Sequence, residues 1–99
     1  MRYAVELTKG VVQKIVGWNL SSHLQSEILK GLDRLSVNPR QSLIRVGPPY
    51  DVLQYDLAIR EPGNPPRDYL FVFTVFYSTD EETLVIPDCQ YDCENVRAE

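Results

Sequence analysis

The chain has 99 residues, of which 43% are hydrophobic and 24% are charged. This length and composition fit one globular domain spanning residues 1–99, and they exclude a disordered tail, a collagen-like repeat and two independent cores. Ten lysines and arginines stand against 14 aspartates and glutamates, so the formal net charge of −4 excludes the broad positive field of many nucleic-acid-binding proteins.

Export and membrane insertion are not expected. The first residues, Met1–Thr8, include Glu6 and lack the apolar core of a signal peptide. The most apolar run, Tyr69–Tyr77, is too short to cross a bilayer. Cys89 and Cys93 form a C-x3-C pair that we expect to remain reduced. The sequence therefore predicts a cytoplasmic protein without a membrane role.

A short strand and a short helix are predicted at the start of the chain. Apolar and polar residues alternate over residues 3–7, which is the period of a strand with one buried face. Thr8 can cap a helix in which the apolar residues between Val11 and Val16 recur at helical spacing. Gly17 and the residues after it are expected to end this helix.

A longer helix is predicted to begin after Ser21 or Ser22, because serine is a common helix-capping residue. Its apolar residues recur at steps of three or four, and they are Leu20, Leu24, Ile28, Leu32 and Leu35. Polar residues occupy the opposite face. Because proline cannot continue a helix, the Asn38-Pro39 step ends this element near Val37.

Short strands and turns are predicted after the second helix. Leu43–Val46 is expected to form a short strand before the turn sequence Gly-Pro-Pro at residues 47–49. Strict alternation of apolar and polar residues predicts a strand over Leu53–Arg60. The proline-rich segment Glu61–Arg67 cannot continue a central strand, so we expect a protruding hairpin loop there.

The segment Tyr69–Tyr77 is apolar on both faces and rich in strand formers, which predicts the central strand of the sheet. One face would meet the helices, and the other would be covered by a loop, a terminus or another chain. Ser78–Glu82 is a turn sequence, and Thr83–Ile86 is predicted as the final strand, ending before Pro87. The last residues are expected to fray.

These elements predict an α+β domain in the order β-α-α-β-β-β. The last block holds three strands, or four if Leu43–Val46 pairs with a neighbour. We expect an antiparallel sheet with two helices packed on one face.

Sequence motifs for common cofactors and metals are missing. The chain has no glycine-rich phosphate loop, no repeated two-cysteine pair at zinc spacing and no nucleophilic-serine elbow. His23 is the single histidine, and it falls on the polar face of the longer helix, where a solvated side chain explains it better than a catalytic base. We therefore expect no cofactor and no metal.

Arginines and tyrosines of the later segments form a more suggestive set. Arginine can clamp a phosphate group, and tyrosine can stack on an exposed base. The members of this set are Arg45, Arg60, Arg67, Tyr69, Tyr77 and Tyr91. A structural explanation competes, and we favour it: the tyrosines complete the core or a sheet face, and the arginines lie on its rim.

The order of elements resembles the RelE/ParE toxin superfamily over nearly the whole chain. The segment Ile28–Pro39, ILKGLDRLSVNP, is similar to that family's second helix, and the block closing on Phe71–Tyr77, FVFTVFY, is similar to its late antiparallel strands. Members similar to this chain are small bacterial proteins that an antitoxin holds inactive. One branch cleaves messenger RNA on the ribosome, and other members inhibit gyrase.

The resemblance implies a divergent toxin whose candidate catalytic residues are Arg60, Arg67 and Tyr91. These residues stand approximately where the ribonuclease branch carries its phosphate-binding and tyrosine side chains. Asp56 and apolar residues occupy other expected positions, so the catalytic pattern is not intact and RNA cleavage would be weakened or lost. The implied partners are an antitoxin-like protein and, if activity remains, the ribosome and messenger RNA.

A non-catalytic protein-binding module on the same scaffold is the alternative. It would use an aromatic sheet face to hold a partner helix or to associate with itself. A free-standing hydrolase that uses His23 or the cysteines has almost no support in the sequence.

Overall fold

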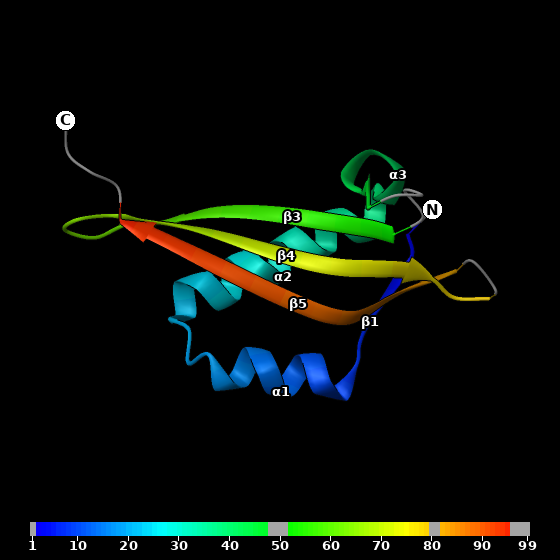
Figure 1. Ribbon diagram of the computed structural model, residues 1–99, viewed down its shortest axis with the longest axis horizontal. Helices are drawn as coiled ribbons and strands as arrows, with labels where there is room; N and C mark the ends of the chain where they lie inside the picture. The colour runs from blue at the N-terminus through cyan, green and yellow to red at the C-terminus, as the bar shows by residue number, and fades with distance from the viewer. Residues whose placement is uncertain (1, 48–51, 80–81, 96–99) are drawn as a thin grey trace.

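The computed structural model describes residues 2–47, 52–79 and 82–95, and it has the predicted α+β class. Three helices and five strands occur within these residues (Figure 1). In chain order they are β1 (Ala4–Leu7), α1 (Lys9–Gly17), α2 (Ser22–Val37), α3 (Pro39–Ser42), β2 (Ile44–Val46), β3 (Val52–Glu61), β4 (Arg67–Tyr77) and β5 (Thr83–Asn95).

The strands form one sheet in the order β1-β5-β4-β3-β2. β4 is the middle strand, which confirms the prediction that Tyr69–Tyr77 is central. The prediction of a wholly antiparallel sheet is wrong, because β1 pairs with β5 in parallel, with Ala4 opposite Thr83. Parallel pairing needs a long connection between two strands, and nearly the whole chain connects these two. All other neighbouring strands are antiparallel.

The two predicted helices begin at their predicted caps. The Thr8 hydroxyl accepts a hydrogen bond from the backbone N–H of Val11, and the Ser21 hydroxyl accepts one from Leu24, at 3.4 and 3.3 Å. Each bond satisfies one of the backbone donors that have no partner in the first turn of a helix. After α1, Asn19 has φ 54°, a left-handed conformation that asparagine tolerates better than most residues.

α2 ends at Val37 as predicted, but Pro39 does more than stop it. Pro39 is the first residue of α3, a short helix that the sequence analysis did not predict. Proline suits this position because the first N–H of a helix has no partner within the helix. α3 carries Arg40 to the side of β2, where a pocket described below forms.

β5 extends far beyond the predicted strand Thr83–Ile86. The pairing between β4 and β5 shifts register between Thr74 and Phe76, which marks a β-bulge. Pro87 falls in this bulge, where the extra residue takes no part in the hydrogen-bond ladder, so proline is tolerated. The prediction that the final strand ends before Pro87 is therefore wrong, because β5 continues to Asn95.

Parts of two predicted turns lie outside the described residues. Gly47 has φ 73°, which favours glycine, but the prolines of the first turn fall within residues 48–51. In the second turn, Ser78 donates its backbone N–H to the carbonyl of Thr83, and residues 80–81 are not described. The last residues, 96–99, also lie outside the described part.

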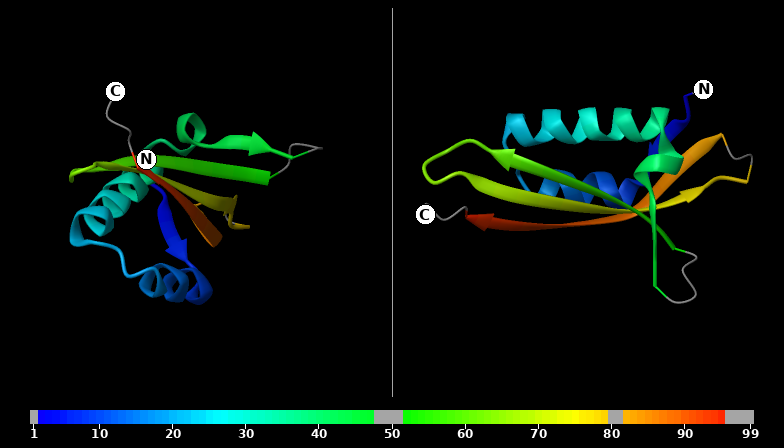
Figure 2. Two further views of the ribbon diagram at one scale, coloured as in Figure 1. Left: turned by 60° about the vertical axis from the view of Figure 1, so that its left-hand side comes forward. Right: turned by 90° about the horizontal axis from the view of Figure 1, so that it is seen from above.

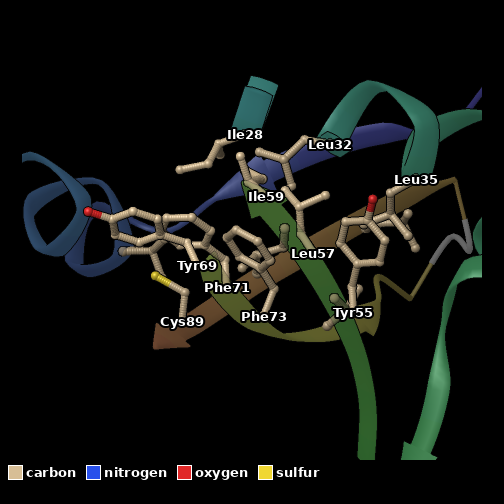
Figure 3. Packing of buried hydrophobic residues seen from close by; sticks show 14 of the residues in the cluster. Ile28, Leu32, Leu35, Tyr55, Leu57, Ile59, Tyr69, Phe71, Phe73 and Cys89 are labelled. Carbon is tan, nitrogen blue, oxygen red and sulfur yellow. The ribbon is translucent and has the colours of Figure 1, made fainter. Parts of the chain in front are cut away.

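α1 and α2 lie on the same side of the sheet, as predicted (Figure 2). Apolar side chains of α2 pack onto the side chains that β3, β4 and β5 direct toward the helices (Figure 3). The centre of this core is formed by Phe71 and Phe73, which are fully buried. Aromatic burial of this extent makes a large contribution to the stability of a small domain.

Helix α2 lies close to the sheet at Gly31. A methyl group added at Gly31 would lie 2.6 Å from a Leu57 methyl carbon, so only glycine fits there without displacing Leu57. The Tyr55 hydroxyl donates a hydrogen bond of 2.8 Å to the Gly31 carbonyl oxygen. Together these contacts fix how α2 lies along β3.

The opposite side of the sheet is covered by no helix or strand among the described residues. It faces the viewer in Figure 1, with α2 behind the sheet. We call this surface the open face. Toward the hairpin end of this face, three neighbouring rows of side chains cross β3, β4 and β5, namely Arg60–Asp68–Glu94, Ala58–Leu70–Asp92 and Asp56–Val72–Gln90, and the row Gln54–Thr74–Asp88 follows them. β4 therefore has apolar side chains on its second face, as predicted, and one of them, Leu70, is 40% exposed.

Candidate functional site

Arg60, the first predicted catalytic residue, lies on the open face at the hairpin end of β3. It donates two hydrogen bonds to Asp68 on β4, from Nε to Oδ1 at 2.8 Å and from a terminal nitrogen to Oδ2 at 3.1 Å. This ion pair holds the pKa of Asp68 below its ordinary value and raises the pKa of Arg60. A phosphate group would therefore have to compete with a carboxylate that already occupies the guanidinium.

Arg67 and Tyr91 lie on the other side of the sheet, facing the helices. Arg67 donates a hydrogen bond to the Tyr69 hydroxyl. The Tyr91 ring packs edge-on against Trp18, with the ring centres 4.6 Å apart. It also stacks on Phe71, with the ring centres 5.6 Å apart. The pKa of Tyr69 is raised, mainly by desolvation. The structure thus separates Arg60 from Arg67 and Tyr91 by the thickness of the sheet, and the three do not form one site.

The Asp68 carboxyl should titrate at a lower pH than an ordinary aspartate, and Arg60→Gln should move its midpoint upward. The carboxylate loses both hydrogen bonds in this variant, so its charged form is less favoured. Because the folded-state pKa is lowered, the contribution of the pair to stability is present above the unfolded-state pKa and is lost as the pH falls through the folded-state value.

The titration can be followed by the carboxyl carbon chemical shift of Asp68 in NMR spectra. Arg40→Gln serves as the control, because Arg40 lies in α3 and no contact joins it to Asp68 among the described residues. An unchanged midpoint in Arg60→Gln would show that the ion pair does not form in solution.

Two arginines and two tyrosines meet in a different pocket, of about 370 Å³, beside β2. Its polar side chains come from α3, β2, β4 and the residue before β1, and they are Arg40, Arg45, Tyr77 and Tyr3. The rings of Tyr3 and Tyr77 are in edge-on contact, with their centres 5.8 Å apart. Guanidinium and phenol groups that line one pocket can bind an anion.

Sequence reasoning found only half of this pocket. Arg45 and Tyr77 were in the suggestive arginine and tyrosine set. Tyr3 was missed because its approach to Tyr77 depends on the unexpected parallel pairing of β1. Arg40 was missed because α3 was not predicted, although a proline at the first position of a helix is a recognisable start signal.

The open face combines an apolar strip with an excess of negative charge. Its middle row holds Ala58, Leu70 and Asp92 across three strands, and a shallow hollow of about 500 Å³ lies over this row and the row of Arg60. Carboxylates on the three rows are contributed by Asp56, Asp68, Asp92 and Glu94, whereas Arg60 supplies the single positive charge. Since Asp68 neutralises Arg60, the remaining field over this face is negative.

The histidine and the cysteines do not form a metal site. Within the described residues, no group of three histidine, cysteine or acidic side chains has a geometry that could hold a metal ion. Cys89 is buried under the helices, and this burial raises the pKa of its thiol, whereas Cys93 is exposed. His23 is exposed on α2, consistent with a solvated side chain.

Comparison of the chain with protein-family models, with curated proteins and with solved structures finds no match. In the part of the chain that the structure describes, no helix is both long enough and apolar enough to cross a membrane.

Proposed function

We propose that this protein is a protein-binding module whose open face holds a basic, amphipathic segment of a partner protein. The observation that carries this proposal is the uncovered strip of Leu70 and Val72, bordered by carboxylates on both neighbouring strands. Exposed apolar surface with a charged border is typical of a binding surface, and the sign of the border selects the partner.

The same charges weigh against an RNA ligand on this face. Phosphate binding relies on lysine and arginine, and it is opposed by carboxylates such as Asp56 and Asp92. A segment with alternating apolar and basic side chains would bury its apolar residues on Leu70 and Val72 and place its cations beside the acidic rows. This is why we favour the protein-binding function over the endoribonuclease function.

The resemblance to RelE/ParE toxins suggests where such a partner would be encoded. Toxins of that superfamily are held inactive by an antitoxin, so a short reading frame beside this gene is the first candidate. On this proposal the chain is a divergent, toxin-like member of a toxin–antitoxin pair in which binding is kept and catalysis is weak or lost. A partner with an acidic rather than basic binding segment would contradict it.

A direct test uses two synthetic peptides, one of alternating lysine and leucine and one of alternating glutamate and leucine. The lysine peptide should shift the amide NMR signals of Leu70, Val72 and Asp92, and the glutamate peptide should not. Asp56→Asn combined with Asp92→Asn should lower the affinity for the lysine peptide about tenfold and reduce the salt dependence of its binding.

Asp33→Asn is the matched control, because Asp33 is an exposed carboxylate on α2, away from the open face. It should leave the affinity for the lysine peptide unchanged. Equal binding of both peptides, or signal changes confined to the helices, would overturn the proposal.

The pocket of Tyr3, Arg40, Arg45 and Tyr77 supports a second candidate function, action on RNA at the ribosome. The supporting observation is that two arginines reach one pocket lined by tyrosines. Expression of the chain should then arrest growth, and Arg40→Gln with Arg45→Gln should relieve the arrest. If the folded protein leaves growth and cellular RNA unchanged, this second candidate is wrong.

A further inference from the structure

One edge of the sheet is left without a partner strand. β3 runs for 10 residues, but β2 pairs only with Val52–Gln54. The remaining edge, Tyr55–Glu61, faces outward along the upper side of the sheet in Figure 1, and no strand among the described residues pairs with it. We call Tyr55–Glu61 the free edge. Every second residue of such an edge directs an unpaired N–H and C=O group away from the sheet.

The free edge carries charged residues, but it lacks three other features that usually prevent strand pairing. It contains no proline and no lysine, and the bulge of this sheet lies between β4 and β5. Its outward side chains on the open face are Asp56, Ala58 and Arg60, and the small Ala58 stands in the middle. The edge is therefore ready to accept an extended strand.

The ends of the free edge determine which strand fits it best. At one end, Ile44 of β2 already occupies the place beside Gln54. At the other end, the chain leaves the strand after Glu61 and enters the hairpin loop. A strand that pairs with the whole free edge must therefore have one end beside Tyr55, next to β2, and its other end beside Glu61, where the loop begins. The free edge of a second copy meets both conditions when it runs antiparallel and the two Ala58 residues face each other.

The charges select the same register independently. With the two Ala58 residues opposite each other, Asp56 of one copy faces Arg60 of the partner subunit, and the pair occurs twice. Arg60 bonds Asp68 through Nε and one terminal nitrogen, so its other terminal nitrogen would donate to Asp56 across the junction. Moving the centre to Leu57 or to Ile59 places Ala58 opposite one of the charged residues instead. Opposite charges that face each other across a strand pair are stabilising, whereas a shifted register loses both pairs.

We propose that two copies of this chain associate through their free edges. Their sheets then join into one continuous sheet, with an antiparallel junction centred on Ala58. A two-fold axis perpendicular to the sheet relates the copies. Both open faces then form one face of the joined sheet. The two α2 helices lie on its opposite face, one on each side of the two-fold axis. Leu70, Val72 and Asp92 lie on β4 and β5, away from the junction, so a dimer can still bind a partner there. Asp56 takes part in both proposals, and the two are told apart by Asp92→Asn, which should weaken peptide binding and leave the dimer unchanged.

Sedimentation velocity over a range of concentrations tests the association. The unmodified chain should show a dimer. Asp56→Arg should place two arginines opposite each other, and Arg60→Asp should place two aspartates opposite each other, so each single variant should dimerise at least about tenfold more weakly. The double variant Asp56→Arg with Arg60→Asp restores opposite charges across the junction and should regain the dimer.

Asp33→Arg, an exposed charge change on α2, should leave dimerisation unchanged, and circular dichroism should show that every variant is folded. Recovery in the double variant separates a charge contact from general damage to the strand. A monomer at all concentrations, or a dimer that neither single variant weakens, would overturn the proposal.

A cross-linking experiment tests the register itself. In a Cys93→Ser background, Ala58→Cys should form an intermolecular disulfide under mild oxidation. Thr74→Cys, which lies in the middle strand, should not. A dimer in which Ala58→Cys does not cross-link faster than Thr74→Cys would mean that the copies meet elsewhere or that the free edge takes another chain.

Discussion

Phe73→Ala is expected to lower the free energy of unfolding by about 3–5 kcal/mol, the usual range for truncating a buried phenylalanine. Phe73 is fully buried at the centre of β4, and its ring stacks with Tyr55 at a centre-to-centre distance of 6.2 Å. A domain of this size has a total stability of about 5–15 kcal/mol, so the variant should be marginally folded at room temperature. Urea titration followed by circular dichroism measures the change.

Phe76→Ala provides the matched control for this prediction. Phe76 lies on the same strand but faces the other way, and its side chain is 47% exposed. Its truncation removes fewer contacts and opens no enclosed cavity, so we expect a change of less than about 1.5 kcal/mol. Equal losses of unfolding free energy in the two variants would contradict the conclusion that Phe73 faces the core and Phe76 faces solvent.

Gly31→Ala is expected to be less stable than Gly10→Ala by about 1–3 kcal/mol, the usual cost of overpacking a core. Gly31 lies inside α2, where alanine gains at least as much helix propensity as at Gly10 in the first turn of α1, so a lower stability of Gly31→Ala must come from packing. The new methyl group at Gly31 would lie 2.6 and 2.7 Å from the two methyl carbons of Leu57, whereas nothing lies within 4 Å at Gly10. Leu57 is buried, with little room to move.

Leu57→Ala should relieve this clash. The Leu57→Ala variant should have about the same free energy of unfolding with and without Gly31→Ala. A double-mutant cycle by chemical denaturation measures the coupling between the two sites. If Gly31→Ala is as well tolerated as Gly10→Ala, α2 does not lie as close to β3 as the structure has it.

The helices and the central strand could be predicted because their signals are local. Thr8 and Ser21 cap the two helices, and Pro39 limits the second one. The apolar character of both faces of Tyr69–Tyr77 identified the middle strand before its neighbours were known. In each case the deciding residues lie within a few positions of the element that they define.

The extent of β5 was missed because Pro87 was given too much weight. Cys89, Tyr91 and Cys93 alternate with polar residues, which is the period of a strand with one buried face, and the structure pairs them with β4. This signal was present in the sequence. A bulge that removes the need for a proline N–H could not be foreseen, because it depends on the register of the partner strand.

The predicted catalytic set failed to assemble for a similar reason. Arg60 and Arg67 are close in the sequence, yet the register of the hairpin places them on opposite sides of the sheet. Which residue of a hairpin faces which layer changes with a shift of one position, and a proline-rich loop does not fix that shift in the sequence. The ion pair of Arg60 with Asp68 is likewise a product of the register.

The pairing of β1 with the start of β5 has a consequence for how the chain folds during its synthesis. Ala4 is synthesised well before its partner Thr83, with α1, α2, β3 and β4 between them in the chain. Until Thr83 has left the ribosome, β1 has no strand to join, and the helix-facing side chains of β5, such as Ile86, are missing from the core. Long-range pairing of this kind slows folding, so the domain should complete its sheet only after its helices have formed.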